Sequence, residues 1–321
     1  MNVKYKFSAK VIFEIILILL TTIIIVVSIV FINLQNKLNK VYIDKEKFLI
    51  DDKDNQEKSQ SEYIKNIVLL GIDSSSYNIG RSDCIMIATI DTKHDNIKLT
   101  SIIRDSYVSI PGKNVNDKIN HAYAFGGPEL TLQTLNQNFN LNITDFISLN
   151  LSSFPKIIDD IGGVTLNITD DELKYINKYI QSLNKLNTTS SPYISSSGIQ
   201  TVDGTQALAY LRIRYTDGGD FERSHRQRVV IEAIFQKMKN FPINKDYEIL
   251  NLLLPNVDTN LTPSEIVSTC FDLSLMHNKN IIEERFPKDE DGEGKLLNGI
   301  YYYTFDKDST IDKIHTFIYG S

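Results

Sequence analysis

Between positions 64 and 105, three short apolar runs are each followed by charged side chains. The runs cover residues 67–70, 85–90 and 99–103, and they are rich in Ile and Leu. Short apolar runs of this kind predict buried β-strands. We therefore expect three neighbouring strands whose ends gather charged residues, at the place where open α/β sheets bind their ligands. These residues are Asp73, Arg81, Asp83, Arg104 and Asp105, and together they predict an anion and metal site.

After residue 110 the pattern alternates between helix-like and strand-like segments. Strands are predicted over residues 143–151 and 164–168, and helices over 129–138, after Pro128, and over 151–161. Further helices are predicted over residues 172–183, 205–211, 248–254, 263–275 and 308–318, and a further strand over 301–303. This order favours an α/β fold: one layered domain over residues 64–321, with a central, mostly mixed β-sheet flanked by helices.

Residues 11–32 are apolar apart from Glu14 and a few hydroxyls. As a helix they would span about 33 Å, enough to cross a bilayer core of about 30 Å. We expect an uncleaved transmembrane signal anchor, because a cleavable signal peptide has a shorter apolar region and a small-residue cleavage site. This predicts a cytoplasmic tail over residues 1–10, a polar stalk over 33–63, and a single-pass protein of the cell membrane whose domain is extracytoplasmic. Lysines before the segment favour this orientation, although others follow it.

Composition narrows the classes of function. The net charge is −6 and basic residues form no long runs, so a general nucleic-acid-binding surface is not expected. The two cysteines, Cys84 and Cys270, stand in apolar surroundings without CxxC spacing. We therefore expect two buried thiols instead of a disulfide or a zinc site.

The second informative stretch, residues 203–236, is rich in arginine. Its arginines are Arg212, Arg214, Arg223, Arg226 and Arg228. Arginine suits phosphate because its planar fork matches two oxygens and keeps its charge. On a helix, Arg223 shares a face with Gln227, whereas Arg226 and Arg228 do not point the same way. By charge pattern alone, a solvated helix face paired with nearby acids is the better explanation.

The combination of motifs favours the phosphate interpretation instead. Six segments occur in order behind one apolar segment: LLGID with GRSD, SIIRDSYV, KINHAYAFGG, IDDIGGV, DGTQALAYLRIRY and GDFERSHRQ. Over residues 66–236, with a looser continuation to the end, the chain closely resembles the LytR-CpsA-Psr (LCP) family of extracytoplasmic phosphotransferases. The resemblance implies transfer of a glycopolymer phosphate, of the teichoic acid or capsule type, from a polyprenyl-pyrophosphate carrier to peptidoglycan, with Mg²⁺.

The resemblance also implies roles for individual residues. Asp73 and Asp83 match the metal-associated acids, and together with Arg104 they are the expected catalytic residues. The positions that match the pyrophosphate-binding set are Arg81, Arg104, Arg212, Arg214, Arg223 and Gln227. Mg²⁺ needs only a few carboxylates when water and phosphate oxygens complete its shell. Two departures are visible: no proline precedes Arg104, and His225 matches no role and is expected at the surface.

The sequence leaves two assignments open: the residue that accepts the proton, and the residues that line the lipid site. Either Asp73 or Asp105 would accept the proton of an acceptor hydroxyl, although a neighbouring arginine lowers a carboxylate's pKa and weakens it as a base. The apolar lining for a polyprenyl chain would come from residues 146–151, 154–161 and 229–235, which would equally serve as ordinary core.

Two other classes of protein use much of the same pattern. A non-catalytic, membrane-anchored binder of polyprenyl-phosphate lipid or cell-wall polymer would need the arginines but not Asp73 and Asp83. A hydrolase would release the pyrophosphate to water. The phosphotransferase interpretation requires that Arg212, Arg223 and Asp83 face the same side of the molecule.

Overall fold

The computed structural model describes residues 63–73, 80–113, 116–214, 219–239, 254–276 and 280–320, and a few positions before residue 63. In these residues a central sheet of seven strands has the order β1-β10-β7-β2-β3-β4-β11. Its strands are β1 (Asn39–Lys40), β2 (Ile64–Asp73), β3 (Arg81–Asp91), β4 (Asn96–Ile102), β7 (Asp145–Asn150), β10 (Val257–Thr259) and β11 (Asn280–Phe286). The predicted runs thus form three adjacent strands, β2, β3 and β4.

The sheet is mixed, as the sequence predicts. β3 runs antiparallel to both β2 and β4. β7 lies parallel to β2 on one side, and β11 lies parallel to β4 on the other. The C-terminal ends of β2 and β7 therefore lie side by side at one end of the sheet, next to the N-terminal end of β3.

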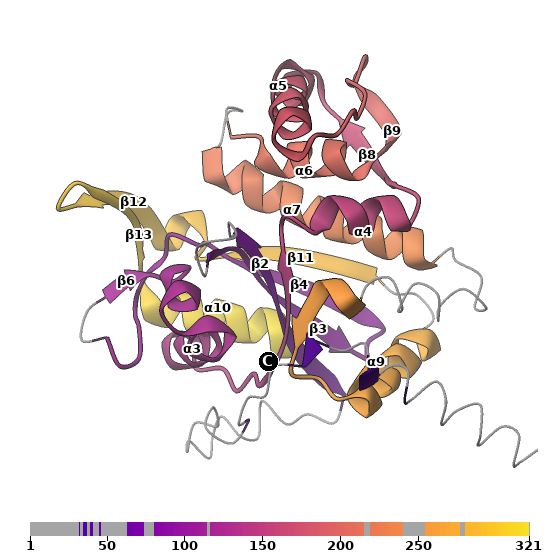
Figure 1. Ribbon diagram of the computed structural model, residues 1–321. Coiled ribbons are helices and arrows are strands. Elements are labelled where there is room, and N and C mark those ends of the chain that lie inside the picture. Colours follow the sequence, from indigo (N-terminus) through magenta and orange to yellow (C-terminus); the bar gives the residue numbers. More distant parts are fainter. Residues whose placement is uncertain are drawn as a thin grey trace, which may run out of the picture.

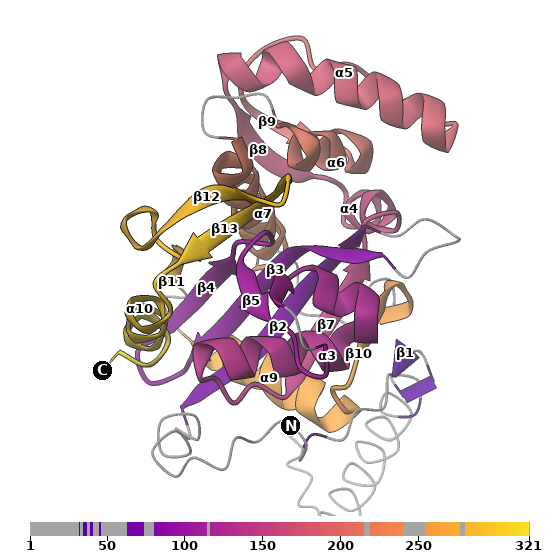
Figure 2. The same ribbon diagram turned by 90° about the vertical axis from the view of Figure 1, so that its left-hand side faces the viewer.

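Helices cover both faces of the sheet (Figures 1 and 2). On one face, α3 (His121–Phe139) and α10 (Lys307–Tyr319) pack on apolar strand residues such as Val68 and Ile85. On the other face, α7 (Gly219–Lys239) packs on Met86 through Ile231 and Phe235. The strands are therefore buried on both sides, which explains their nearly continuous apolar runs.

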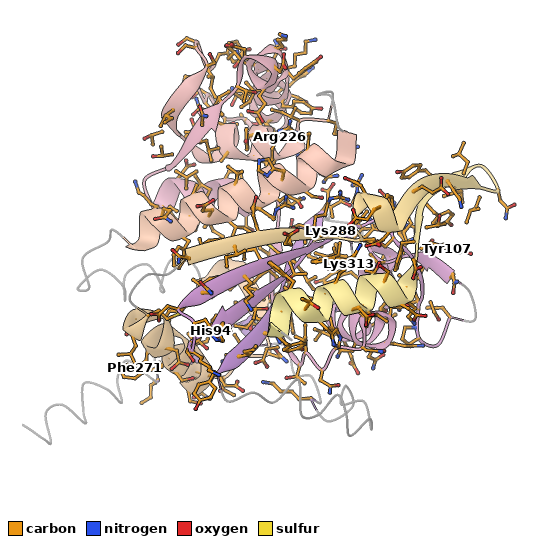
Figure 3. The ribbon with its side chains drawn as sticks, turned by 180° about the vertical axis from the view of Figure 1, so that it is seen from behind. His94, Tyr107, Arg226, Phe271, Lys288 and Lys313 are labelled. Atoms are coloured by element: carbon orange, nitrogen blue, oxygen red, sulfur yellow. The ribbon has the colours of Figure 1, made fainter. Side chains whose placement is uncertain are left out.

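Beyond α7 lies a second layer with its own core. It contains α4 (Phe154–Asp160), β8 (Val164–Ile168), α5 (Asp170–Asn187), β9 (Gly198–Val202) and α6 (Gly204–Arg212), as Figure 1 shows. Arg226 of α7 is 1% exposed; its Nε donates to Oε1 of Glu172 on α5 at 2.8 Å, and its Nη1 donates to the carbonyl of Ile213 at 3.2 Å. Figure 3 shows Arg226 between α7 and this layer. The guanidinium group of Arg226 therefore holds α7 to this layer, and it is too buried to contact a ligand.

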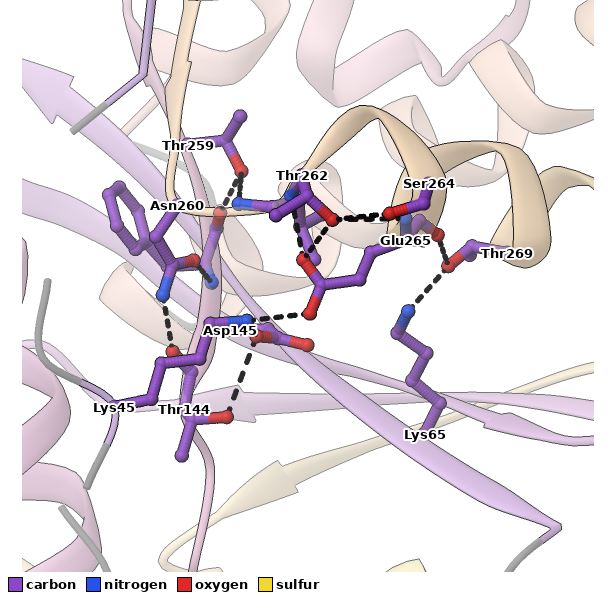
Figure 4. A network of polar contacts seen from close by, with 12 residues as sticks. Lys45, Lys65, Thr144, Asp145, Thr259, Asn260, Thr262, Ser264, Glu265 and Thr269 are labelled. Atoms are coloured by element: carbon purple, nitrogen blue, oxygen red, sulfur yellow. Dashed lines mark hydrogen bonds and ion pairs between the residues drawn. The ribbon is translucent and has the colours of Figure 1, made fainter. Parts of the chain in front are cut away.

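Part of the predicted stalk contacts the domain. β1 pairs in parallel with β10, and Nζ of Lys45 donates to Oδ1 of Asp145 at 2.6 Å and to Oε1 of Glu265 at 2.9 Å (Figure 4). Glu265 also closes a capping box with Thr262 at the start of α9 (Pro263–Leu275). Burial raises the pKa of Glu265, but bonds from Thr262 and Lys45 outweigh burial and lower it to about 2. At these positions the chain is not a purely solvated spacer.

Several boundaries differ from the predicted ones. α3 begins before Pro128 and is kinked at Gly126 and Gly127, whose backbone angles are not helical. β11 and the hairpin of β12 (Gly292–Leu297) and β13 (Ile300–Phe305) extend beyond the one strand predicted in this region. Neither cysteine forms a disulfide, but Cys270 is exposed, so the prediction of two buried thiols was wrong for it.

Two predicted helices fall mostly outside the described residues. The segment 11–32 does so apart from Ile32, and 248–254 does so apart from Leu254, which begins the 3₁₀ turn Leu254–Asn256. Within the part of the chain that the structure describes, no helix combines the length and apolar character needed to cross a membrane.

Candidate functional site

Asp83 lies at a β-bulge between β2 and β3. Gly71 pairs with Cys84, whereas the next residue, Ile72, pairs with Ser82, so Asp83 is the extra residue. A bulge reverses the alternation of side chains and is common beside active sites. Here the hydroxyl of Ser82 points to the loop before α3, while Cys84 lies on the α7 face. The bulge thus places Asp83 near the N-terminal end of β3, within reach of both faces of the sheet.

Two arginines from distant parts of the chain converge on the carboxylate of Asp83. Nη2 of Arg223, near the start of α7, donates to Oδ2 at 3.0 Å, and Nη1 of Arg104, just after β4, lies 3.0 Å from the same oxygen. The side chains of Asp83 and Arg223 are only 10% and 6% exposed. One turn along α7, Gln227 donates to the backbone carbonyl of Asp83 at 3.2 Å. Arg223 and Gln227 therefore share the face that meets Asp83.

Further polar residues extend this cluster away from α7. Nε of Arg104 lies 3.4 Å from Oδ2 of Asp105, and Nζ of Lys118 lies 2.5 Å from Oδ1 of Asp105. The amide of Asn120, just before α3, donates to Oδ1 of Asp83 at 3.4 Å. Asp83 is thus held from the α7 side by Arg223 and from the α3 side by Arg104 and Asn120.

The turn that carries Arg104 forms without a preceding proline. The N–H of Ile103 donates to the carbonyl of Phe286 on β11 at 2.9 Å, and the N–H of Ser106 donates to Ile103 at 3.0 Å. These backbone bonds fix the turn by contacts to the neighbouring strand and within the turn. Arg104 therefore keeps its place beside Asp83.

The electrostatics of Asp83 follow from these contacts. Burial raises the pKa of this carboxyl, but the charges and hydrogen bonds of Arg223 and Arg104 outweigh burial and hold the pKa below its ordinary value of 3.8. Asp83 is therefore ionised at neutral pH and is a weak base. Its negative charge in turn orients the two guanidinium groups.

We expect the stabilising effect of Asp83 to depend on pH. Because its folded-state pKa is lowered, the contribution is fully present above the unfolded-state value near 3.8 and is lost as the pH falls through the folded-state pKa. Urea denaturation of the wild type and of Asp83→Asn at a series of pH values measures the effect. The wild type should be the more stable protein at neutral pH, and the difference should shrink below about pH 4. A difference that stays constant through this range would contradict the assignment.

A pocket of about 650 Å³ lies between the sheet and the helices above it. The strands β2, β3, β7 and β10 contribute to one side, and α4, α5, α6 and α7 contribute to the other. Most of the lining is apolar and includes Leu149, Leu151, Phe154, Leu211, Ile231 and Ile234. The charged lining residues come from the end of β2, the end of α6 and the first turns of α7. The pocket therefore combines a long apolar wall with a cationic region.

The structure brings most of the predicted site residues together. The pocket is lined by Asp73, Arg212, Arg214, Arg223 and Gln227, and Arg223 pairs with Asp83, which also pairs with Arg104. Arg81 differs, because it is exposed, lies opposite Asp73 in the ladder and is not among the described lining residues. All three predicted apolar segments contribute to the lining. The roles of these side chains in binding, catalysis and metal coordination stay predictions.

Arg228 serves the packing of α7 against the sheet, and His225 lies at the surface. Nε of Arg228 lies 3.1 Å from Oε2 of Glu283 on β11, and its Nη1 donates to Ser101 at 3.2 Å. His225 is exposed, as predicted, with Nδ1 3.4 Å from Oε1 of Glu283. Arg226 and Arg228 thus pair with acids, but both side chains are buried, so the explanation by a solvated helix face was wrong for them.

Sequence reasoning missed some members of the site. Lys118 and Asn120 stand in the segment KINHAYAFGG, in which no functional residue was predicted. Leu208 and Leu211 of α6 and Tyr179 of α5 also line the pocket. The motif itself was the available signal for Lys118 and Asn120, whereas nothing in the pattern distinguished the α6 residues from ordinary core.

Fold and site together define a protein that can hold an apolar chain with an anionic head group. The profile of the LytR_cpsA_psr family matches residues 28–316. A teichoic acid transferase of Oceanobacillus iheyensis, polyisoprenyl-teichoic acid–peptidoglycan teichoic acid transferase TagU, is 36% identical over 263 residues, which cover 79% of this chain and 75% of the relative. This chain belongs to the LytR_cpsA_psr family.

Solved structures agree with this assignment. The crystal structure of B. subtilis TagT has a TM-score of 0.63 and 26% identity, and the match covers 81% of this chain and 92% of TagT. A structure of TagT bound to LI-WTA has a TM-score of 0.64 and 25% identity over 85% of this chain and 96% of that one. The layered fold with a central mixed sheet is therefore that of known members of the family.

Proposed function

We propose that this chain is a phosphotransferase that moves an anionic glycopolymer, of the teichoic acid type, from a polyprenyl-pyrophosphate carrier to peptidoglycan. The observation that carries the proposal is the apolar pocket whose charged lining includes Arg212, Arg214 and Arg223. An apolar wall next to clustered guanidinium groups suits a lipid diphosphate. The activity for which the TagU relative is named, teichoic acid transfer to peptidoglycan, supports the same substrates.

The arginines supply most of the chemistry in this proposal. The oxygen of the acceptor hydroxyl attacks the phosphorus next to the glycopolymer. The bond from that phosphorus to the oxygen that bridges the two phosphates breaks. Polyprenyl phosphate leaves with the bridging oxygen. Negative charge grows on the equatorial and leaving oxygens, where Arg223, Arg212 and Arg214 stabilise it. Asp83 keeps Arg223 and Arg104 in place before the substrate arrives.

Asp73 is the better candidate for the proton acceptor. It lines the pocket and is exposed, and it forms no ion pair with any residue in the described part of the chain. The carboxylate of Asp105 is instead already paired with Lys118 and Arg104. Asp73→Asn should lose transfer whether Asp73 accepts the proton of the acceptor hydroxyl or holds an ion. Unchanged binding of Mg²⁺ and donor by this variant would identify Asp73 as the proton acceptor, and lost Mg²⁺ binding would identify it as a ligand.

We also propose that Mg²⁺ is held by Asp73 and Asp83. Carboxylate oxygens from adjacent strands are the hard ligands that Mg²⁺ prefers, and lipid phosphates and water would complete the shell. When bound, the ion would neutralise charge on the phosphates. The described residues contain no group of three or more His, Cys, Asp or Glu suited to a metal, so the protein alone should bind the ion weakly. Calorimetric titration of Mg²⁺ with and without a diphosphate ligand tests this, since only the ligand-bound protein should bind it well.

We further propose that residues 11–32 anchor the protein in the cell membrane, with the domain outside the cytoplasm. The proposal rests on the length and apolar character of this segment. Alkaline extraction of membranes should leave the full-length protein in the pellet. Release into the supernatant would contradict a spanning anchor.

The full-length protein, supplied with a polyprenyl-pyrophosphate-linked polymer, separates the three candidate activities. With a glycan acceptor present, we expect polymer attached to glycan together with free polyprenyl phosphate. Release of polymer at the same rate without acceptor would identify a hydrolase. Tight binding of the lipid without any product would identify a binder.

A further inference from the structure

An aromatic surface lies beside the turn that carries Arg104. It consists of Tyr107 on β5 (Tyr107–Ser109), Phe125 on α3, and Tyr301 and Tyr302 on β13, and we call it the aromatic patch. Phe125 and Tyr301 are each 45% exposed. The rings of Tyr107 and Tyr302 meet edge to face, with centroids 4.9 Å apart. Figures 2 and 3 show the β12–β13 hairpin next to β5, and Figure 3 shows Tyr107 at this place.

The backbone fixes the aromatic patch to the site. Ser106 forms a β-bridge with Tyr303, and the N–H of Tyr303 donates to the carbonyl of Asp105 at 2.8 Å. The backbone of the hairpin thus pairs directly with the turn after β4. A ligand on the hairpin's aromatic side chains would lie next to the Arg104 turn.

Lys118 on β6 (Asn116–Lys118) links the aromatic patch to the charged cluster. Its Nζ lies 5.9 Å and 5.8 Å from the ring centroids of Tyr301 and Tyr302. The same Nζ lies 2.5 Å from Asp105, which contacts Arg104. The path from the aromatic patch to Asp83 therefore consists of a few direct contacts.

Polar groups stand among the rings. Nδ1 of His121 lies 2.8 Å from Oδ2 of Asp117, and the hydroxyl of Tyr302 donates to Oδ1 of Asp117 at 3.4 Å. The ring of His121 also meets Phe125 edge to face, with centroids 6.0 Å apart. Sugar rings have C–H faces that pack on aromatic rings, and hydroxyls at their edges that bond to such polar groups. The combination suits a glycan better than a purely apolar partner.

The position of the aromatic patch also fits the geometry of transfer. In a displacement at phosphorus, the attacking and leaving oxygens lie roughly in line on opposite sides. The pocket, with Arg223, lies on the α7 side of Asp83, whereas Arg104 and Asn120 reach Asp83 from the side of the aromatic patch. An acceptor there would approach opposite the leaving polyprenyl phosphate.

We propose that the aromatic patch is the acceptor subsite, which binds the hexopyranose rings of a glycan strand and presents one hydroxyl to the phosphate beside Arg104. The assignment deepens the proposed transfer to peptidoglycan and rests on it. It assigns a binding role to the hairpin β12–β13, which contributes two of the four rings.

Binding of soluble glycan strands to the full-length protein tests the subsite directly, without turnover. In calorimetric titrations, Tyr301→Ala and Phe125→Ala should each weaken glycan binding by up to about tenfold, and the double variant should weaken it further. Tyr301→Phe keeps the ring and should bind as the wild type does. Tyr193→Ala is the matched control, because Tyr193 is 56% exposed but lies outside the aromatic patch, in the segment after α5.

The transfer assay separates this proposal from the proposed function. If it is correct, the double variant raises KM for glycan but leaves KM for the lipid donor unchanged. Normal transfer, with glycan affinity and KM unaffected by the substitutions, would overturn the subsite and leave the function standing. A wild type that binds glycan through the aromatic patch but transfers nothing would overturn the function instead. Absence of any glycan binding by the wild type would also overturn the subsite.

Discussion

Replacing Arg223 by alanine should lower the rate of polymer transfer by about two to three orders of magnitude, the usual loss when one preorganised donor to a developing charge is removed. Arg223 both lines the pocket and pairs with Asp83 at 3.0 Å, and its side chain is 6% exposed. In this shielded place its charge is weakly screened. The measurement is transfer to glycan under single-turnover conditions, where product release does not limit the rate.

Two further variants control this experiment. Arg223→Lys keeps the positive charge but loses the planar fork, so it should restore only part of the rate. His225→Ala removes an exposed side chain two positions along the same helix and should leave the rate unchanged. Urea denaturation of each variant confirms that it is folded. If folded Arg223→Ala transfers polymer as fast as His225→Ala, Arg223 has no role in the reaction.

Local signals account for the parts of the fold that could be predicted. The runs that became β2, β3 and β4 are buried on both faces, so their apolar character is nearly continuous. The predicted helix 263–275 matches α9, where Thr262 and Glu265 form a capping box and Pro263 begins the helix. Such features lie within a few residues of each other and need no knowledge of the rest of the chain.

Pairing between distant segments could not be predicted in the same way. β11 has only one fully buried residue, Phe286, and its partner β4 lies far upstream. The bulge at Asp83 depends on a register shift between β2 and β3, to which the apolar pattern is blind. The contact of Lys45 with Asp145 joins two segments 100 positions apart. Non-local contacts of this kind decide where an edge strand pairs and where a side chain is re-aimed.

The arginines of α7 show the same limit within the site. Helical spacing correctly grouped Arg223 with Gln227, because residues four apart share a face. It could not decide which face meets the ligand. That choice depends on two acids from other elements. Glu172 of α5 binds Arg226, and Glu283 of β11 binds Arg228. Only the remaining face of the helix, with Arg223, is directed to Asp83.

Replacing Ile234 by tryptophan should weaken binding of long polyprenyl donors while sparing short ones. Ile234 lines the apolar part of the pocket on α7, so a larger ring there would displace lipid from the wall. Each buried CH₂ contributes about 0.8 kcal/mol, so excluding one five-carbon unit would cost roughly 3–4 kcal/mol, which is more than 100-fold in affinity as an upper estimate. Titration with lipid diphosphates of increasing chain length measures this effect.

The dependence on chain length distinguishes a blocked apolar pocket from a damaged head-group site. A diphosphate that carries a single five-carbon unit contacts the arginines but little of the apolar wall, so Ile234→Trp should bind it as the wild type does. Ile234→Leu keeps the volume and should bind both ligands normally. Ile199→Trp adds the same ring at a side chain that is 79% exposed on β9 and should also have no effect. Equal weakening for short and long donors in Ile234→Trp would mean that the pocket does not hold the lipid chain, because only the head group would then be sensed.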